Sequence, residues 1–587
     1  MLRCVFQREV LDMLLRLATG LSTCRTIVRR MKQFRKDEDG SMVLFSLFIL
    51  MLMLMAGGMA VDVMRAEYMR VTIQQTLDRA VLAAADLDQT EDAKGVVVDY
   101  FDKAGLAAYL DPNDVYVNHS SAAGQLSYRR VSATASTDVD AIFMQMLGID
   151  TLAAAGSSTA EEGITDLEIS LVVDVSGSMG DPSSTGNSKI YELREAAKDF
   201  SYYMQCNPNT TRNSGATCSV GEGKVSITLV PYSEQVVVGE DLLDGFDVSA
   251  EHDDSHCVTF AASDFDTVSI PLDVELSRTG HFDPWGNGTY ASNNRRTCRT
   301  NSWREIRLFV EDWTELGGYI NSLSAGGNTS IDLGMKWGAA LLDPSVQPIV
   351  QEFTNTAYGA GNKKIHASFA NRPYAYTQDY SMKVIVLMTD GRNTSQHYLK
   401  DEYRDGLSEV WRNTYYNDRY SIYNADRDEY YYTYDGTWNP EPFGDMDGEE
   451  VTTTNTYCYW SWWYGRRCYT ETVTEVVNQP GSAVQMKYQE VWEEFTTDWF
   501  GDWSWLPNPE QSWGNSTKNT RLNNICSAAK NAGIIIYTIG FEVSGSDGTV
   551  MSNCATTPAH YFSANGSNLA QTFGVIASSI NQLRLTQ

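Results

Sequence analysis

Five oxygen-bearing side chains are spaced along the chain in a way that suits a hard divalent cation. Asp174, Ser176 and Ser178 alternate in the loop DVSGS, so one carboxylate and two hydroxyls can turn toward a single point. Thr329 lies in the glycine-rich segment SAGGNTS, and Asp390 lies in the segment MTDG. Oxygen ligands of this kind suit Mg²⁺, with Mn²⁺ as the alternative. Because Asp and Ser are also ordinary turn residues, the prediction depends on the surrounding elements.

Those elements indicate a parallel sheet with ligands at the carboxyl ends of its strands. The run LEISLVVD, which ends at Asp174, is apolar without polar alternation, as in a strand buried on both faces. MKVIVLMT is a second such run directly before Asp390. Helical segments follow the polar loops, at Lys189–Met204 and from Thr329 to about Leu342. In such α/β units, ligands bind beyond the strands' carboxyl ends, so we expect the five side chains to meet there.

Further segments continue the alternation of strands and helices. KVSITLVPYSEQVVV (Lys224–Val238) predicts a strand, KNTRLNNICSAAKNAG predicts a helix ending at Gly533, and IIIYTIGFEV predicts another strand. The last segment, NLAQTFGVIASSINQLRL, has apolar residues on one helical face. The predicted fold class is α/β, a doubly wound and mostly parallel sheet with helices on both sides.

The order DxSxS, then Thr, then a strand followed by TDG resembles the metal-ion-dependent adhesion site of von Willebrand factor A domains. The resemblance implies direct coordination by Ser176 and Ser178, direct or water-mediated coordination by Thr329, and mainly water-mediated contact by Asp174 and Asp390. It also implies an open position for an acidic residue of a protein partner. The A-type domain would span residues 163–587, with insertions at about 239–303 and 394–516.

The insertions are rich in aromatic residues, and the sequence leaves their role open. They include DEYYYTYDGTWNPEPF and YCYWSWWYGRRCY. Exposed aromatic side chains are enriched at protein interfaces, so these loops could flank a partner on the metal side of the domain. Equally, the aromatic residues could form the core of an additional subdomain.

An uncharged segment near the N-terminus predicts a membrane anchor. MVLFSLFILMLMLMAGGMAV contains twenty residues and would rise ~30 Å as a helix, which matches the hydrocarbon core of a bilayer. A basic segment precedes it, with Arg25, Arg29, Arg30, Lys32, Arg35 and Lys36. Since positive residues stay in the cytoplasm, we expect residues 1–41 inside, a single span over residues 42–63, and the remainder outside. The run begins too late and is too long for a cleaved signal peptide.

A second resemblance covers about residues 34–160. The segments DEDGSMVLFSLFIL, AVDVMRAEYMRVTIQQTLDRAVLAAA and MLGIDTLAAAGSSTA resemble the TadE/TadG-like proteins of the Flp (Tad) pilus system. Pilin-like members are cut after a Gly that is followed five residues on by Glu; here Phe45 follows Gly40 at that position, which favours a permanent anchor. The resemblance implies a helix and a small α+β unit at 64–162, anchored in a bacterial inner membrane with the bulk in the periplasm.

Eight cysteines follow the anchor, and an even number there predicts disulfides in an oxidising compartment. Eight cysteines allow about 105 pairings. The simplest pairing joins sequence neighbours: Cys206–Cys218, Cys257–Cys298, Cys458–Cys468 and Cys526–Cys554.

Composition narrows the functional classes. The formal net charge of −30 opposes binding to nucleic acid. No GxSxG, P-loop or GxGxxG motif follows a strand in the required context, so we do not expect an enzyme; a metal-dependent hydrolase would lack an arranged base or nucleophile. The favoured hypothesis is a pilus-assembly or secretion accessory protein that docks a partner's carboxylate onto bound Mg²⁺. The alternative is a surface adhesin that uses the same domain.

Overall fold

The computed structural model describes residues 41–86, 89, 91–122, 125–163, 165–358, 362–446, 449–543 and 545–586. The chain forms two compact units, Met1–Gly163 and Ile164–Gln587. The predicted cytoplasmic segment lies outside the described residues, apart from its last residue.

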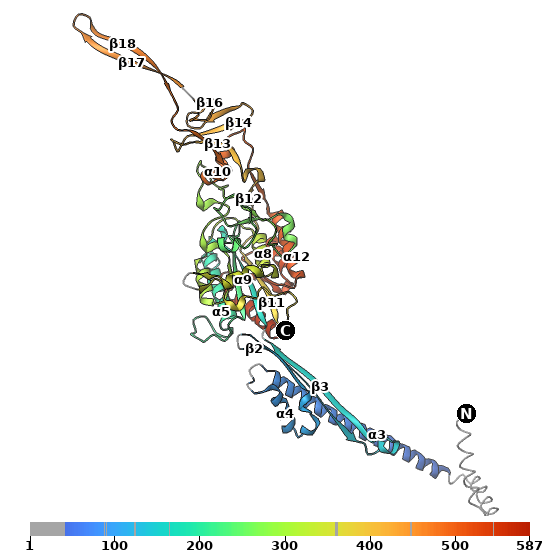
Figure 1. The fold of residues 1–587 in the computed structure, drawn as a ribbon. Helices are drawn as coiled ribbons and strands as arrows, with labels where there is room; N and C mark the ends of the chain where they lie inside the picture. Colours follow the sequence, from blue (N-terminus) through green and yellow to red (C-terminus); the bar gives the residue numbers. More distant parts are fainter. Residues whose placement is uncertain are drawn as a thin grey trace, which may run out of the picture. The chain divides into compact units, whose positions relative to one another are not determined.

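In unit 1 a single long helix, α3 (Ser41–Ala85), contains the predicted anchor (Figure 1). It continues through Gly57 and Gly58 without a break, because neither glycine leaves helical geometry. Its mean hydropathy reaches 2.4, and among the described residues it is the one helix long and apolar enough to cross a membrane.

The second half of α3 packs on a small antiparallel sheet of order β1-β2-β3. The strands are β1 (Val115–Ala122), β2 (Gln125–Asp140) and β3 (Thr151–Gly163), and α4 (Ala93–Lys103) completes the layer. The core contains Ile73 and Leu77 of α3, Phe101 of α4 and Val131 of β2. Arg129 of β2 donates from Nη1 to the carbonyl of Asp86 at 2.7 Å, and so satisfies backbone acceptors where α3 ends. Short 3₁₀ turns are η2 (Ala107–Tyr109), η3 (Pro112–Asp114) and η4 (Met144–Leu147).

Unit 2 is built on a six-stranded sheet of order β22-β21-β11-β4-β5-β8. β8 is antiparallel to β5, and the other neighbours are parallel. Taken in chain order this is 6-5-4-1-2-3, the order of a doubly wound sheet. The predicted fold class is confirmed. The strands are β4 (Asp166–Asp174), β5 (Val225–Tyr232), β8 (Arg307–Val310), β11 (Ser381–Thr389), β21 (Ile535–Phe541) and β22 (Tyr561–Ala564).

Helices cover both faces of this sheet, so its strands need no polar face. Leu171 and Val173 of β4 pack in one core with α5, α7 and α14, whereas Val172 packs in the other with α8, α9, α12 and α13. The helices are α5 (Lys189–Gln205), α7 (Trp313–Ser322), α8 (Ile331–Ala340), α9 (Gln347–Asn355), α12 (Asn515–Asn531), α13 (Ser546–Cys554) and α14 (Leu569–Thr586).

One predicted strand is shorter than expected. β5 ends at Tyr232, not at Val238. Ser233 donates its N–H to the carbonyl of Gln235 at 3.1 Å, which turns the chain, and Val237 then forms an isolated bridge with Glu305. The apolar run VVV is buried as a loop, which the sequence pattern alone could not distinguish from a continued strand.

The insertions predicted at about 239–303 and 394–516 pack together in one aromatic core. Phe282 from the first lies among Trp492, Phe495 and Phe500 from the second. Arg296 joins them further, because its guanidinium donates to the carbonyls of Trp492 and Glu493 at 2.9 and 2.7 Å. A substantial share of the aromatic residues therefore forms a subdomain core.

The second insertion contains most of the additional strands. β12 (Gln396–Leu399) pairs with β20 (Glu510–Trp513) where the insertion begins and ends. A five-stranded sheet has the order β16-β15-β14-β13-β19, and β17 and β18 form a separate ribbon. Their bounds are β13 (Leu407–Asn413), β14 (Tyr420–Asn424), β15 (Glu429–Tyr432), β16 (Thr437–Asn439), β17 (Glu449–Ser461), β18 (Gly465–Val477) and β19 (Ala483–Lys487), with α10 (Tyr488–Glu494) and α11 (Thr497–Gly501).

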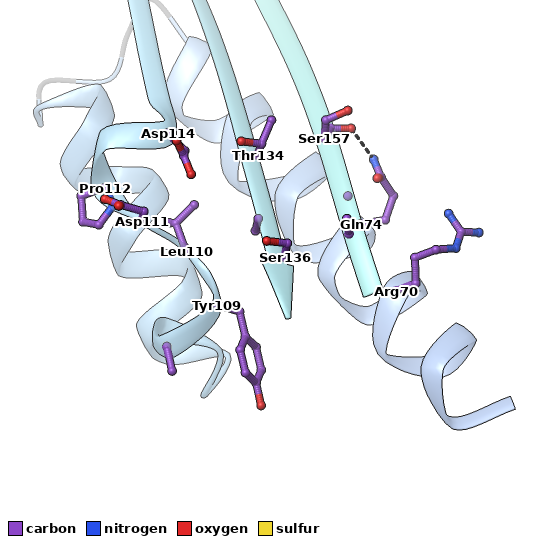
Figure 2. A pocket seen from close by; sticks show the side chains of 14 residues that line it. Arg70, Gln74, Tyr109, Leu110, Asp111, Pro112, Asp114, Thr134, Ser136 and Ser157 are labelled. Carbon is purple, nitrogen blue, oxygen red and sulfur yellow. Dashed lines mark hydrogen bonds between the residues drawn. The ribbon is translucent and has the colours of Figure 1, made fainter. Parts of the chain in front are cut away.

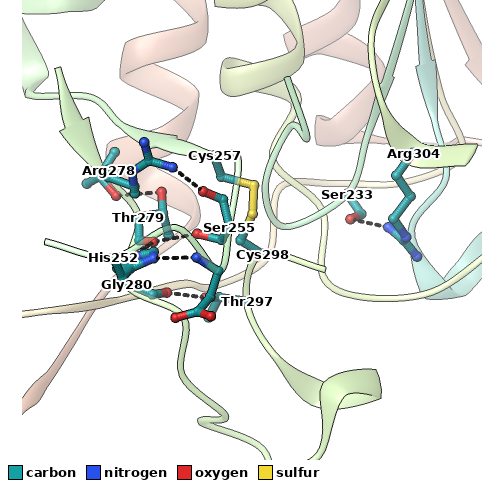
Figure 3. Close-up of a disulfide and its surroundings, with 12 residues drawn as sticks. Ser233, His252, Ser255, Cys257, Arg278, Thr279, Gly280, Thr297, Cys298 and Arg304 are labelled. Atoms are coloured by element: carbon teal, nitrogen blue, oxygen red, sulfur yellow. Dashed lines mark hydrogen bonds between the residues drawn. A yellow bond between two sulfur atoms is a disulfide. The ribbon is translucent and has the colours of Figure 1, made fainter. Parts of the chain in front are cut away.

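Four disulfides are present in unit 2, and they join the neighbouring cysteines named above. The disulfide Cys257–Cys298 links two segments of the first insertion and is fully buried beside Val237. Figure 3 shows it among polar side chains that bind the loop backbone; Ser255, for example, donates from Oγ to the carbonyl of Thr279 at 2.9 Å. The short elements of this region are α6 (Glu240–Leu243), β6 (Val258–Thr259) and β7 (Ser277–Arg278); β9 (Ala357–Tyr358) and β10 (Asn362–Lys363) form a hairpin after α9.

Candidate metal centre

The two predicted carboxylates lie at the carboxyl ends of neighbouring parallel strands. Asp174 is the last residue of β4, and Asp390 directly follows β11. The register pairs Val173 with Met388, so both acidic residues leave the sheet at the same edge. The backbone arrangement is the one that the sequence predicted.

Hydrogen bonds link four of the five predicted side chains. Ser176 donates its backbone N–H to Oδ1 of Asp174 at 2.7 Å. The hydroxyls of Ser176 and Ser178 lie 3.2 Å apart, and Ser178 donates from Oγ to Oδ1 of Asp390 at 2.7 Å. The second carboxylate oxygen of Asp174 accepts from Oγ1 of Thr389 at 2.8 Å. The hydroxyls of Ser176 and Ser178 and the carboxylate of Asp390 therefore form a run of oxygen atoms, and the backbone N–H of Ser176 connects this run to the carboxylate of Asp174.

Backbone contacts bring the loop of Thr329 to the same place. Gly177 donates its N–H to the carbonyl of Gly327 at 2.8 Å, and Gly326 donates to the carbonyl of Val175 at 2.9 Å. A Cβ on Gly177 would lie 3.3 Å from the oxygen of Gly327, so a side chain there would crowd this approach. Thr329 itself is 4% exposed and stands just before the N-terminus of α8.

The cluster concentrates negative charge in a buried place. Asp174 is fully buried and Asp390 is 6% exposed. Burial, and then the charge of Asp390, raise the pKa of Asp174 to about 7. Lys189, the first residue of α5, offsets part of this charge, because its Nζ lies 2.9 Å from Oδ2 of Asp390. The two buried carboxylates carry more negative charge than the single ammonium group of Lys189 neutralises. Further positive charge nearby would therefore stabilise their ionised form.

The oxygen spacing fits a small divalent cation. Ligands at right angles around Mg²⁺, at about 2.1 Å, lie about 3 Å from one another. The separations of Ser176 Oγ from Ser178 Oγ, 3.2 Å, and of Ser178 Oγ from Asp390 Oδ1, 2.7 Å, bracket that value. Both carboxylate oxygens of Asp174 already accept hydrogen bonds from the protein, which suits contact through water. The donor set therefore fits Mg²⁺ or Mn²⁺.

Sequence reasoning missed the cations and hydroxyls that support this cluster. Lys518 of α12 is fully buried and donates from Nζ to the carbonyls of Thr329 and Thr394 at 2.7 and 2.8 Å. Arg304 donates to Ser233 Oγ at 2.7 Å and to the carbonyl of Gly326 at 2.8 Å; Figure 3 includes the first of these bonds. A signal for Lys518 existed, since it precedes the buried Leu522 and Ile525 at helical spacing.

Replacing Lys189 with methionine is expected to strengthen Mg²⁺ binding. The ammonium of Lys189 would compete with a bound cation for the charge of Asp390, so its removal should raise the affinity for Mg²⁺ about tenfold, or about 1.4 kcal/mol. Calorimetric titration of the full chain in detergent measures this. Lys198→Met is the matched control, because Lys198 lies on the same helix and pairs with Glu195. An unchanged or weaker affinity in Lys189→Met would contradict the competition.

Other cavities and ligand clusters lie outside these five residues. In unit 1 a groove of about 950 Å³ lies between α3, β2, β3 and the turns η2 and η3, and Gln74 donates there to the carbonyl of Ser157 at 2.9 Å (Figure 2). In unit 2, Glu222, Glu311 and His366 gather near a cavity of about 370 Å³. The imidazole of His366 lies 3.0 Å from Glu222 and 3.1 Å from Glu311, so the contacts among these three side chains account for their proximity.

The aromatic residues of the second insertion divide into two groups. Trp492 is 2% exposed and belongs to the subdomain core. On the ribbon of β17 and β18, by contrast, Trp460, Trp462 and Trp463 are 76%, 91% and 85% exposed. Both roles left open by the sequence therefore have candidates: one group packs a core, and the other is available for contact.

A short segment near the N-terminus matches a known protein family. Residues 40–87 match the family model described as Flp pilus-assembly TadE/G-like. The chain carries a TadE/G-like segment. This segment contains the whole of α3, in agreement with the resemblance seen in the sequence, and an A-type domain follows it. A search of curated protein sequences gave no match.

Solved structures with distant similarity include a von Willebrand factor domain, a minor pilin and a mussel byssus protein. The von Willebrand factor domain of the type V pili tip protein Mfa5 from Porphyromonas gingivalis is 14% identical, with 71% of this chain and 96% of that chain covered and a TM-score of 0.28. The PilB minor pilin from Streptococcus sanguinis is 12% identical, with 80% and 78% covered and a TM-score of 0.28. Proximal thread matrix protein 1 from the mussel byssus, with a zinc-occupied MIDAS motif, is 8% identical, with 70% and 46% covered and a TM-score of 0.23. At these scores, the fold assignment rests on the strand order of unit 2.

Proposed function

We propose that this protein is a membrane-anchored accessory protein of a Flp/Tad pilus or secretion assembly. Its A-type domain would dock a protein partner through a divalent cation held by Asp174, Ser176, Ser178, Thr329 and Asp390. The observation that carries the proposal is the hydrogen-bonded cluster from Asp174 through Ser176 and Ser178 to Asp390, in a protein with a TadE/G-like segment. The proposal assigns a binding role and no catalytic residue.

The protein's own residues would hold the site in position before a partner arrives. Thr389 and the backbone of Ser176 fix both carboxylate oxygens of Asp174. Lys518 donates a hydrogen bond to the carbonyl of Thr329 and so holds the loop that contains Thr329. A bound Mg²⁺ would supply positive charge and an open ligand position for a carboxylate of the partner. These contacts would hold this protein's own metal ligands in position. The remaining ligand would be an acidic group that arrives with the partner.

The membrane arrangement follows from the basic segment before the anchor. With residues 1–41 in the cytoplasm and a single span at 42–63, both folded units would lie on the periplasmic side of the inner membrane. The disulfides of unit 2 support this side, because structural disulfides persist in oxidising compartments.

Capture from native membranes tests the docking mechanism. Full-length tagged protein, solubilised in detergent, should enrich envelope or pilus components in Mg²⁺ and lose them in chelator. Ser178→Ala should reduce capture at least about tenfold, and amidation of the partner's carboxylates should have the same effect. Ser188→Ala is the matched control, because that hydroxyl makes no capping hydrogen bond at the start of α5.

Two outcomes would count against parts of this proposal. Capture that persists in chelator would remove the metal from the mechanism. Cleavage of unit 2 by protease added to intact cells would place the domain on the surface and favour the adhesin function.

A further inference from the structure

The loop between β2 and β3, residues 141–149, exposes a run of apolar side chains. Its sequence AIFMQMLGI contains no charged residue. The exposed fractions are 57% for Ile142, 39% for Phe143, 68% for Met146, 52% for Leu147 and 39% for Ile149. Continuous apolar surfaces of this kind mark contact sites. Within the described part of the chain, these side chains keep 39–68% of their surface exposed.

Asp62 of α3 fixes this loop to the end of the apolar run of the anchor. Its carboxylate accepts hydrogen bonds from the backbone N–H groups of Ile142, Phe143 and Met144 at 3.1, 2.7 and 2.8 Å. Asp62 is only 1% exposed. The three donors compensate its negative charge, so an acidic residue can stand at the edge of the bilayer without facing lipid.

Phe143 reaches one helical turn deeper along the anchor. A Cβ on Gly58 would lie 2.4 Å from two ring atoms of Phe143, so the ring packs against a backbone that only glycine provides. Gly58 precedes Asp62 by four residues, or about 6 Å along the helix. Gly57 has open space around it. The close approach therefore explains one glycine of the pair and places the loop beside the last turn of the apolar run.

We propose that residues 141–149 form a lipid-contacting foot, which enters the bilayer interface beside α3. The proposal rests on the anchor assigned above. Lipid is the occupant because the neighbouring helix residues at the same level, Val61 and Val63, are themselves exposed and belong to the predicted span. The foot thus continues an apolar surface that already requires lipid.

Backbone polar groups of the foot are paired within the protein, as a poorly hydrated environment requires. Ala141 donates its N–H to the carbonyl of Asp150 at 2.9 Å, and Ile149 donates to the carbonyl of Met144 at 3.2 Å. Non-helical backbone near lipid is stable only when its polar groups are paired. A single helix is free to rotate about its axis, whereas a helix with a foot is not. The foot therefore sets the orientation of unit 1 on the membrane.

Photocrosslinking tests the proposal on the full chain. p-Benzoylphenylalanine at Leu147 is compared with the same probe at Leu52, within the span, and at Tyr116, which is 66% exposed on β1. The chain is reconstituted in vesicles of phosphatidylethanolamine and phosphatidylglycerol. Lipid adducts at Leu147 should approach those at Leu52 and exceed those at Tyr116 at least about tenfold.

Three results would overturn it. Lipid adducts at Leu52 but only protein adducts at Leu147 would give the surface a protein partner. Lipid adducts at Leu52 and none of either kind at Leu147 would place the loop in water. A lack of lipid adducts at both positions would refute the anchor itself, which is a failure of the proposed function.

A second variant tests the role of Asp62 in positioning the foot. Asp62→Ala removes the acceptor for three backbone donors, so lipid adducts at Leu147 should fall while those at Leu52 stay unchanged. Unchanged adducts at Leu147 would overturn that role. Asp78→Ala is the matched control, because Asp78 lies further along α3 and accepts a hydrogen bond from Gln74 of the same helix.

Discussion

Mg²⁺ at about a hundred times its dissociation constant is expected to stabilise unit 2 by about 2.7 kcal/mol against unfolding, since a ligand that binds only the native state adds that free energy. Tryptophan fluorescence during denaturation measures this unit alone, because every Trp of the chain falls between Trp285 and Trp513. The full chain in detergent is compared in Mg²⁺ and in chelator. The difference between the two curves gives the metal's contribution.

Ser178→Ala and Asp174→Ala should both abolish this difference. Ser178→Ala is the easier variant to interpret, because Ser178 is partly exposed and the substitution removes only one hydroxyl, which lies between Ser176 and Asp390. Asp174→Ala also removes an acceptor from Thr389 and relieves repulsion with Asp390, so its metal-free stability can move either way. Ser188→Ala should keep the full difference. A Ser178→Ala protein that is still stabilised by about 2.7 kcal/mol would refute the predicted ligand set.

The framework of the candidate site could be predicted because each of its parts has a local signal. β4 and β11 are continuous apolar runs, and each is followed by an acidic residue in a short polar loop. Strands buried on both faces leave such a signal whatever the rest of the chain does. Since parallel strands end at one edge of the sheet, the meeting of Asp174 and Asp390 followed from topology.

The contacts that tune the site could not be predicted, because they join residues far apart in sequence. Lys189 pairs with Asp390 across 201 positions, and Lys518 binds the Thr329 carbonyl across 189. Neither lysine differs in type from a solvated one. Its helical spacing with Leu522 and Ile525 places Lys518 on the buried face of α12, but only the structure shows that its hydrogen bonds compensate the cost of burial.

The aromatic insertions show the same limit more strongly. Trp492 is buried and Trp462 is exposed, yet both lie in segments rich in aromatic residues. Among the described residues, the two strands of the ribbon form a sheet of their own, and the side chains of Trp460, Trp462 and Trp463 are largely exposed. Whether a Trp side chain is buried therefore depends on the tertiary structure around it, because Trp is compatible with both buried and exposed positions. The β2–β3 loop is similar, since its apolar run shows its role only beside α3.

Removal of the Cys257–Cys298 disulfide, as Cys257→Ala with Cys298→Ala, is expected to destabilise unit 2 substantially. The bridge closes a separation of 41 residues, for which the chain-entropy relation gives about 4 kcal/mol. Both cysteines are fully buried beside Val237, so the lost contacts add to the effect. The loop that it closes contains Phe282, which contributes to the shared core of the insertions. Denaturation followed by tryptophan fluorescence measures the change.

The matched control is Cys458→Ala with Cys468→Ala. This bridge joins paired positions of the ribbon, ten residues apart. Its loop-closure contribution would be about 2.7 kcal/mol if the ribbon unfolded together with the core. The ribbon residues around it are exposed, however, so their opening is local and the stability of unit 2 should change by less than about 0.5 kcal/mol. Equal losses in the two variants would show that the ribbon and the core unfold as one unit, and a negligible loss in Cys257→Ala/Cys298→Ala would show that packing alone holds the first insertion.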